Sequence, residues 1–242
     1  LSLGALNSKA GLFDTNLLAN PNAEDGLAGN GGSLVSPPGW ISNGELNLVS
    51  YSTGVGFPLP ADPGPTNRGN AFFSGFNGPL ATGSQVIDIS SIAAAIDAGG
   101  VSCELAGYLG GFSFQNDNAR VQVNFLNAAS NTLGSLTVGP VLAADRVSAT
   151  GLLLRQSTNT IPSGTRTLGV VLTMSRTDGT YNDGYADNLS VILRSGNRPT
   201  LSIAKIGSQV RLAWPTNFSG FQLETKADLA SPAAWTNFPG AP

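Results

Sequence analysis

The 242-residue chain contains no histidine and a single cysteine, Cys103. Without histidine, the serine–histidine–aspartate and cysteine–histidine arrangements that activate nucleophiles are excluded, as are zinc sites and acid–base chemistry built on imidazole. One cysteine forms no intramolecular disulfide and builds no thiolate zinc or iron–sulfur site. A pair of facing carboxylates, as in glycoside hydrolysis, is the catalytic arrangement that composition leaves open, and no pattern marks one. We therefore expect a protein that is not an enzyme.

Charged residues are also scarce, at 11% of the chain against about 25% in ordinary globular domains. The surface must be built from Ser, Thr, Asn and Gly, which suits a secreted, extracellular β-protein better than a cytosolic enzyme. The twelve Lys and Arg form no cluster and the net charge is −3, which argues against nucleic acid and anionic membranes as partners. No apolar run approaches the ~18–20 residues of a membrane span.

What the sequence does contain is a recurring alternation of apolar and polar residues, broken by clusters of Gly, Asn, Pro and Ser. In ARVQVNFLN, for example, Val121, Val123 and Phe125 face one side and polar residues face the other, as in an antiparallel strand with one buried face. Many short strands with frequent turns predict an all-β, antiparallel jelly-roll β-sandwich. The predicted strands are Glu45–Tyr51, Ala119–Asn127, Thr132–Val138, Thr150–Gln156, Thr167–Arg176 and Asp187–Leu193.

One helix is predicted over Ser90–Gly99 (SSIAAAIDAG), with Ser90 as its N-cap and Gly99 in left-handed geometry at its end. At about two turns it is too short to be stable alone, so we expect it to cap one end of the sandwich. Cys103 lies in the alternating stretch VSCELAGYLGG and is expected to be a buried apolar residue. Trp40, after Pro38 and Gly39, is likewise expected in the core.

A domain boundary is predicted at Ser195–Pro199, after which the strand pattern restarts. The remaining segment of about forty residues is too short for a sandwich without disulfides or metal. It is either the start of a truncated domain or a fragment completed by another chain. We therefore expect an N-terminal extension over 1–15, a main domain over 16–195 and a partial domain over 200–242.

Two segments rich in carboxylates and amides lie at opposite ends of the main domain, Asn16–Gly26 (NLLANPNAEDG) and Asp178–Leu193 (DGTYNDGYADNLSVIL). Calcium prefers six to eight oxygens from carboxylates, amides and backbone carbonyls. If the first and last strands of the sandwich pair, these two segments meet. A bridging cation would then tie them together.

These same segments carry a family resemblance. NLLANPNAEDGLAG with GW near the start, GSQVIDISSIAAAIDAGG in the middle and YADNLSVIL at the end resemble the galactose-binding-like jelly roll of bacterial exported proteins, over roughly residues 12–193. That superfamily includes many carbohydrate-binding modules and domains of PEP-CTERM-type surface proteins. The resemblance implies a structural calcium held by Glu24 and Asp187, with backbone carbonyls near Asn20 and Asn22. The chain departs from the usual first motif at Ala23, where an aromatic residue is common.

The tail, from LSIAKIGSQVRLAW onward, resembles the opening of an Ig- or fibronectin-like repeat of large bacterial exported proteins, and it stops before such a repeat is complete. Within the main domain, the loop aromatics Phe57, Phe76 and Tyr181 are candidates for stacking on a sugar ring. Scattered exposed aromatics are also common in proteins without such a function.

Two functions remain open. In the first, the chain is a non-catalytic binding or adhesion module on a bacterial extracellular surface, directed at a polysaccharide or surface glycan and stabilised by calcium. In the second, it is a self-assembling structural subunit of an extracellular fibre or layer. An incomplete sandwich exposes unpaired strand edges, which would allow strand exchange between copies through the chain ends.

Overall fold

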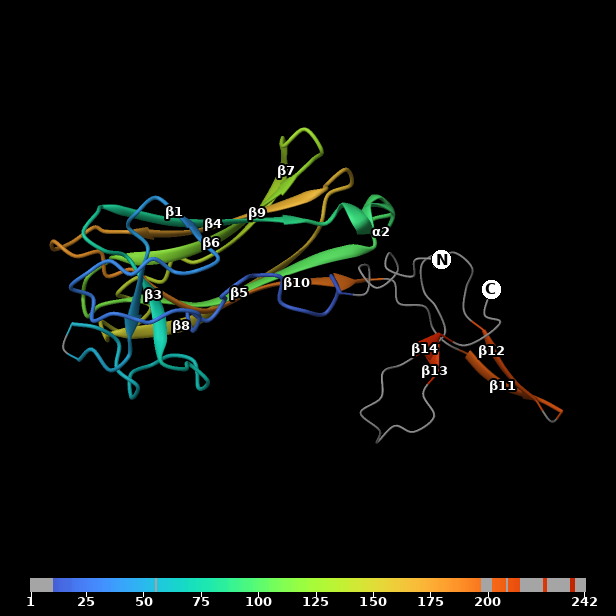
Figure 1. Cartoon of the computed structure of the whole chain (residues 1–242), viewed down its shortest axis with the longest axis horizontal. Coiled ribbons are helices and arrows are strands. Elements are labelled where there is room, and N and C mark those ends of the chain that lie inside the picture. The colour runs from blue at the N-terminus through green and yellow to red at the C-terminus, as the bar shows by residue number, and fades with distance from the viewer. Residues whose placement is uncertain are drawn as a thin grey trace. The chain divides into compact units, whose positions relative to one another are not determined.

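The computed structural model describes residues 11–54, 56–196, 202–207, 209–213, 224–225 and 236–237. The chain divides into two compact units, residues 1–196 and 197–242 (Figure 1). In the described part of the chain, no helix is long and apolar enough to cross a membrane.

The first unit is an antiparallel two-sheet β-sandwich with one short helix, as the sequence predicted. Sheet I has the strand order β1-β4-β9-β6-β7 and sheet II the order β2-β3-β10-β5-β8. Consecutive strands from β4 to β6 and from β7 to β10 alternate between the two sheets, which is the jelly-roll arrangement. The strands are β1 (Ile41–Ser42), β2 (Asn47–Ser50), β3 (Ala71–Ser74), β4 (Leu80–Asp88), β5 (Val101–Gly111), β6 (Asn118–Leu126), β7 (Thr132–Val138), β8 (Gly151–Thr160), β9 (Thr167–Ser175) and β10 (Tyr185–Ser195).

The predicted helix is confirmed in a shorter form, as a 3₁₀ turn, η2 (Ser90–Ile92), followed by α2 (Ala93–Asp97). It lies at one end of the sandwich (Figure 1). Gly99 has φ +72°, the left-handed geometry expected at the helix end. The predicted cap was wrong: Ile89, not Ser90, holds the N-cap position of η2, and it makes no side-chain cap hydrogen bond. The Asp88 Oδ1, one residue earlier, accepts a hydrogen bond from the Ser90 amide at 2.8 Å.

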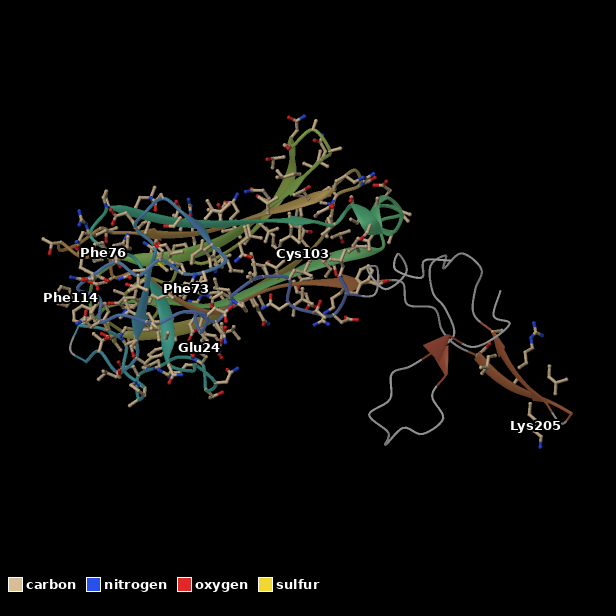
Figure 2. All side chains as sticks on the ribbon, viewed as in Figure 1. Glu24, Phe73, Phe76, Cys103, Phe114 and Lys205 are labelled. Carbon is tan, nitrogen blue, oxygen red and sulfur yellow. The ribbon has the colours of Figure 1, made fainter. Side chains whose placement is uncertain are left out.

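The main core fills the space between the sheets. Cys103 and Phe73 are fully buried there and Trp40 is 7% exposed, so the structural interpretation of Cys103 and Trp40 is confirmed (Figure 2). Burial, and then the charge of Glu104, raise the pKa of the Cys103 thiol to about 12, which leaves the thiol protonated and unreactive at neutral pH.

A second apolar cluster covers the outer face of sheet II, the face turned away from sheet I. It consists of Val49, Tyr51, Phe72, Leu152 and Tyr185. The long connection between β2 and β3, described over residues 51–54 and 56–70, closes over it. This connection, here called the covering loop, reaches as far as β8, where the carbonyl of Pro63 accepts a hydrogen bond from the Leu152 amide at 2.8 Å. Sheet II is therefore buried on both faces beneath the covering loop.

The second unit contains two pairs of antiparallel strands in its described residues. They are β11 (Ser202–Ile206) with β12 (Gln209–Ala213), and β13 (Glu224–Thr225) with β14 (Thr236–Asn237). The predicted Ig- or fibronectin-like identity of residues 200–242 stays a prediction, since most of that segment lies outside the described residues.

The outer cluster can be tested with two leucines of β8 that face the same side. Leu152 is 1% exposed beneath the covering loop, whereas Leu154 is 46% exposed. We expect Leu152→Ala to lower the free energy of unfolding by about 2–5 kcal/mol, because it leaves a cavity. Leu154→Ala should cost less than about 1 kcal/mol. Denaturant unfolding measures both, and equal losses would contradict the second cluster.

Candidate functional site

The N-terminal segment runs beside β10, so the two oxygen-rich segments meet as the sequence predicted. Phe13 and Asn16 form bridges to Leu193 and Ile192. Further along, the Leu189 amide donates to the carbonyl of Pro21 at 2.8 Å. These contacts lie within the first unit, so part of the predicted N-terminal extension packs against the sandwich itself. They also place Glu24 near enough to Asp187 for its charge to raise the pKa of Asp187.

Asp187 is a fully buried carboxylate on the outer face of sheet II. Its Oδ2 accepts a hydrogen bond from the Tyr51 hydroxyl at 2.8 Å, and its Oδ1 accepts one from the Asn188 amide at 2.6 Å. Burial, helped by the negative charge of Glu24, raises the pKa of Asp187 to about 7, while the two hydrogen bonds and Arg68 oppose that rise. This carboxyl therefore keeps its proton to a higher pH than an exposed aspartate does.

A β-bulge determines which way Asp187 points. The register between β10 and β5 shifts between Asp187 and Ser190, and Asn188 has φ +45°. Asn tolerates this left-handed geometry better than most residues. The extra residue turns Leu189 into the core while Asp187 stays on the outer face.

Glu24 binds the start of β3. Its Oε1 accepts hydrogen bonds from the amides of Asn70 (2.7 Å) and Ala71 (2.8 Å), and its Oε2 accepts one from the Asn70 side chain at 3.1 Å. A Cβ atom on Gly69, whose φ is +67°, would lie 2.4 Å from the Glu24 Oε1. Only glycine fits at position 69, and the closeness shows how tightly the carboxylate is held.

Arg68 brings a positive charge to the same place. Its guanidinium carbon lies 5.1 Å from the centre of the Tyr51 ring. Its nitrogens donate to three carbonyls of the covering loop, those of Leu59, Asp62 and Pro65. Arg68 thus folds the covering loop back on itself and lowers the pKa of Asp187 at the same time.

The other two predicted metal ligands lie in the turn before Glu24. The side chain of Asn20 forms hydrogen bonds with the backbone of Asp25 and Pro38. The backbone carbonyl of Asn20 accepts a hydrogen bond from the Trp40 indole at 3.2 Å. Asn22 is half-buried. Among the described residues, no group of three or more His, Cys, Asp or Glu side chains could hold a metal ion. A cation here would therefore have two carboxylates, and the roles of Asn20 and Asn22 stay predictions.

The three candidate aromatics are brought together. The ring of Tyr181 stands edge-on to Phe57, with centroids 5.4 Å apart, and edge-on to Phe76, with centroids 6.0 Å apart. All three rings are partly exposed, and we call them the aromatic row. The Tyr181 hydroxyl accepts a hydrogen bond from the Asn47 side chain at 3.4 Å, and burial raises the pKa of Tyr181. A Cβ on Gly31 would lie 2.3 Å from the Phe57 ring, so a bare backbone flanks the row.

Two residues behind the row were not predicted from the sequence. Tyr185 is fully buried, and its hydroxyl lies 2.6 Å from the Asp183 Oδ1. Burial, and then the charge of Asp117, raise the pKa of Asp183 to about 6, against the effect of the Tyr185 hydrogen bond. The sequence signal was the spacing of Asp183, Tyr185 and Asp187, because alternate residues of an extended chain share a face.

The aromatic row lies near the end of the sandwich opposite α2. Figure 2 shows Phe76 at that end, together with Phe114, which is 74% exposed. The loop that carries Phe114 is held by Arg146, a buried side chain that donates to the carbonyls of Ser113 and Gln115, both at 3.0 Å. Phe114 was also not predicted, since one aromatic residue in a loop carries no pattern.

No protein-family model matches the sequence, and no curated protein matches it. Among solved structures, a family 16 carbohydrate-binding module is 19% identical, with a TM-score of 0.44, covering 73% of this chain and 99% of that one. A cyclase from Fischerella sp. TAU, solved with an indolyl butanone, is 12% identical, with a TM-score of 0.49, covering 75% and 98%.

The enzymatically active domain of tailspike protein 4 from bacteriophage CBA120 is 14% identical, with a TM-score of 0.44, over 74% of this chain. This chain spans only 21% of the length of that tailspike chain. The matches thus include both a binding module and enzymes, and at these identities the similarity is one of fold.

The buried carboxyl of Asp187 predicts a particular pH dependence of stability. Its pKa is about 7 in the folded protein and 3.8 in a free chain, so the folded state holds its proton longer. The free energy of unfolding of the metal-free protein should therefore fall as pH rises from about 4 to about 7, by on the order of 3 kcal/mol, and then level off.

Urea titrations across this pH range check the sign. Asp187→Asn should remove most of the slope, and Asp183 should account for a smaller remainder that ends near pH 6. Asp178→Asn, at an exposed position in the same segment, should leave the slope unchanged. A slope that persists in full in Asp187→Asn would show that this carboxyl is not the titrating group.

Proposed function

We propose that the chain is a non-catalytic carbohydrate-binding module of an exported bacterial protein and that the aromatic row is its sugar-binding surface. The observation that carries this proposal is the meeting of Phe57, Phe76 and Tyr181, which come from three different loops. Sugar rings stack their C–H faces on aromatic side chains, while amides and hydroxyls beside the rings satisfy the sugar hydroxyls.

The surroundings of the row suit such a ligand. The Asn47 amide contacts the Tyr181 hydroxyl and supplies a polar group beside the rings, while the backbone at Gly31 packs directly against Phe57. The likeness of the fold to a family 16 carbohydrate-binding module agrees with this function without carrying it. The low charge of the chain is what supports an extracellular location.

The absence of catalysis rests on the chemistry of the available groups. The chain has no histidine. Asp117 and Asp183, the two neighbouring buried acids near the row, are both engaged. Asp117 accepts hydrogen bonds from the amides of Asp178 and Asp183, both at 2.9 Å, and Asp183 is bonded to Tyr185. These hydrogen bonds explain both carboxyl groups as structural, so we assign no catalytic role to Asp117 or Asp183.

Affinity electrophoresis in gels containing xylan, mixed-linkage β-glucan or galactan tests the binding proposal. We expect retention on at least one neutral polysaccharide. Phe76→Ala and Tyr181→Ala should each weaken it by roughly tenfold, the effect of losing one stacked ring. Phe114→Ala is the matched control, an exposed phenylalanine at the same end of the sandwich. Silence on neutral and acidic glycans alike would overturn the proposal.

We also propose that a structural calcium ion lies between Glu24 and Asp187. What supports this proposal is that Asp187 is fully buried and that Glu24 lies near enough for its negative charge to raise the pKa of Asp187. The Glu24 Oε2 and both oxygens of Asp187 accept one hydrogen bond each and so keep a lone pair, whereas the Glu24 Oε1 already accepts two. When bound, calcium would supply the charge that offsets the two carboxylates, and backbone carbonyls near Asn20 and Asn22 would complete its shell.

Calcium removal should lower the melting temperature by roughly 5–10 °C, since a ligand bound only to the folded state stabilises it. The drop on adding EDTA should be larger at pH 8 than at pH 5, because protonated Asp187 competes with the metal. Glu24→Gln should abolish the response. Glu45→Gln is the matched control, a glutamate that also accepts a backbone hydrogen bond, from Gly78 at 2.8 Å. An EDTA-insensitive melt would reject the site.

Self-association remains the second candidate. Residues 11–17 pack against β10 of the same chain, so this stretch is not free for exchange. The hairpin of β11 and β12 is the feature that favours assembly, because a two-stranded hairpin is marginally stable in water by itself. Its Ile206 is 56% exposed. A subunit of a fibre would bury such a residue against another copy.

A further inference from the structure

The hydroxyl of Tyr185 lies between two hydrogen-bond acceptors. The Asp183 Oδ1 is 2.6 Å away and the carbonyl oxygen of Gly56 is 3.0 Å away. A phenol has a single hydrogen to donate. With Asp183 ionised, therefore, only one of the two contacts is a hydrogen bond.

Protonation of Asp183 removes this conflict. A protonated carboxyl donates to the Tyr185 oxygen, and the Tyr185 hydrogen is then free to bond to Gly56. When the proton leaves, the carboxylate attracts the Tyr185 hydrogen more strongly than a neutral carbonyl does, because charge-assisted hydrogen bonds are the stronger ones. The carbonyl of Gly56 then loses its donor.

Gly56 precedes Phe57, the member of the aromatic row that belongs to the covering loop. Phe57 also contacts Phe72 and Tyr185, with ring centroids 6.3 Å away in both cases. The bond from Tyr185 to Gly56 is therefore a polar contact that holds this part of the covering loop against sheet II.

We propose that Asp183 and Tyr185 are positioning residues for the aromatic row, and that a proton held between their side chains decides whether the Phe57 segment is fixed against the sheet. Sugar binding is then stronger at acidic pH than at alkaline pH. This last consequence rests on the proposed function, whereas the movement of Phe57 does not.

The charged groups around Asp183 agree with this direction. Asp117 faces it from the segment before β6, and Tyr181 and Tyr185 face it from its own segment. The Arg146 guanidinium and the Asp183 carbonyl both lie 3.1 Å from the place that a Cβ on Gly111 would take, but that guanidinium is committed to the backbone carbonyls of Ser113 and Gln115. Asp183 thus has a negative neighbour and no ion pair in the described part of the chain, and burial with Asp117 brings its pKa to about 6.

Fluorine NMR of the full chain labelled with 4-fluorophenylalanine tests the movement without any ligand. The Phe57 resonance is assigned from its loss in Phe57→Leu. We expect this resonance to shift between pH 5 and pH 8, with a midpoint near 6. In Asp183→Asn, whose amide donates at every pH, it should stay at its acidic position. In Tyr185→Phe it should stay at its alkaline position.

Two controls separate Asp183 from the other acids. Asp178→Asn, at an exposed position in the same segment, and Asp187→Asn, in the carboxylate pair with Glu24, should both keep the midpoint near 6. A Phe57 resonance that does not respond to pH, or that titrates in Asp183→Asn as in the parent, would overturn the proposal.

Retention on whichever neutral polysaccharide the parent binds is the second readout. It should weaken by roughly threefold to tenfold between pH 5 and pH 8, the effect of one lost neutral hydrogen bond. Asp183→Asn should be retained equally at both pH values. Equal retention of the parent at both would overturn the coupling to binding. If no polysaccharide retains the parent, the function fails while the fluorine result still decides the movement of Phe57.

Discussion

Two carboxylates buried on the outer face of sheet II determine how the rest of this site is built. A buried carboxylate is costly unless hydrogen bonds or an opposite charge compensate it. Asp183 and Asp187 receive that compensation from two tyrosine hydroxyls, those of Tyr185 and Tyr51. Tyr51 extends the pairing of β2 with β3, since its amide donates to the Asn70 carbonyl at 2.9 Å, and from there its hydroxyl reaches Asp187. Phe57 and Arg68 of the covering loop pack against the same aromatic cluster.

The same buried charge can be balanced in three ways, and these link the parts of the site. Arg68 supplies a fixed positive charge, a proton neutralises the carboxyl at lower pH, and a divalent cation would offset both Asp187 and Glu24. Proton and cation exclude one another at Asp187, since a metal ligand must be ionised. Asp183 lies apart from Glu24 in the contacts described, so its proton acts on the aromatic row independently. One face of one sheet thus holds a stability site and a proposed binding site side by side.

The sandwich could be predicted well from the sequence, because strands that bury one face show an alternation of apolar and polar residues. β7 matches its predicted range, and β6 and β9 match theirs to within one residue. The sequence also named Glu24 and Asp187 as partners and Phe57, Phe76 and Tyr181 as separate candidates, but no pattern showed that the three rings would contact one another. The second cluster could not be predicted, because its members lie on strands buried on both faces, where alternation disappears: Val49 and Phe72 read as part of ordinary apolar runs. The contact between Pro63 and β8 could not be predicted either, because the path of a long loop depends on tertiary contacts that no local pattern shows.

Strand β10 shows how the fold and the site are reconciled. Ala186, Leu189 and Val191 point into the main core, while Tyr185 and Asp187 point to the outer face. Strict alternation cannot satisfy this sequence, because Ala186 and Leu189 are an odd number of residues apart and would face opposite sides. The bulge at Asn188 absorbs the extra residue, so that both ends of the strand fill the core and both outward side chains reach the covering loop. A substitution that straightened this bulge would therefore move either Asp187 into the core or Leu189 out of it, and the carboxylate site could not survive independently of the packing between the sheets.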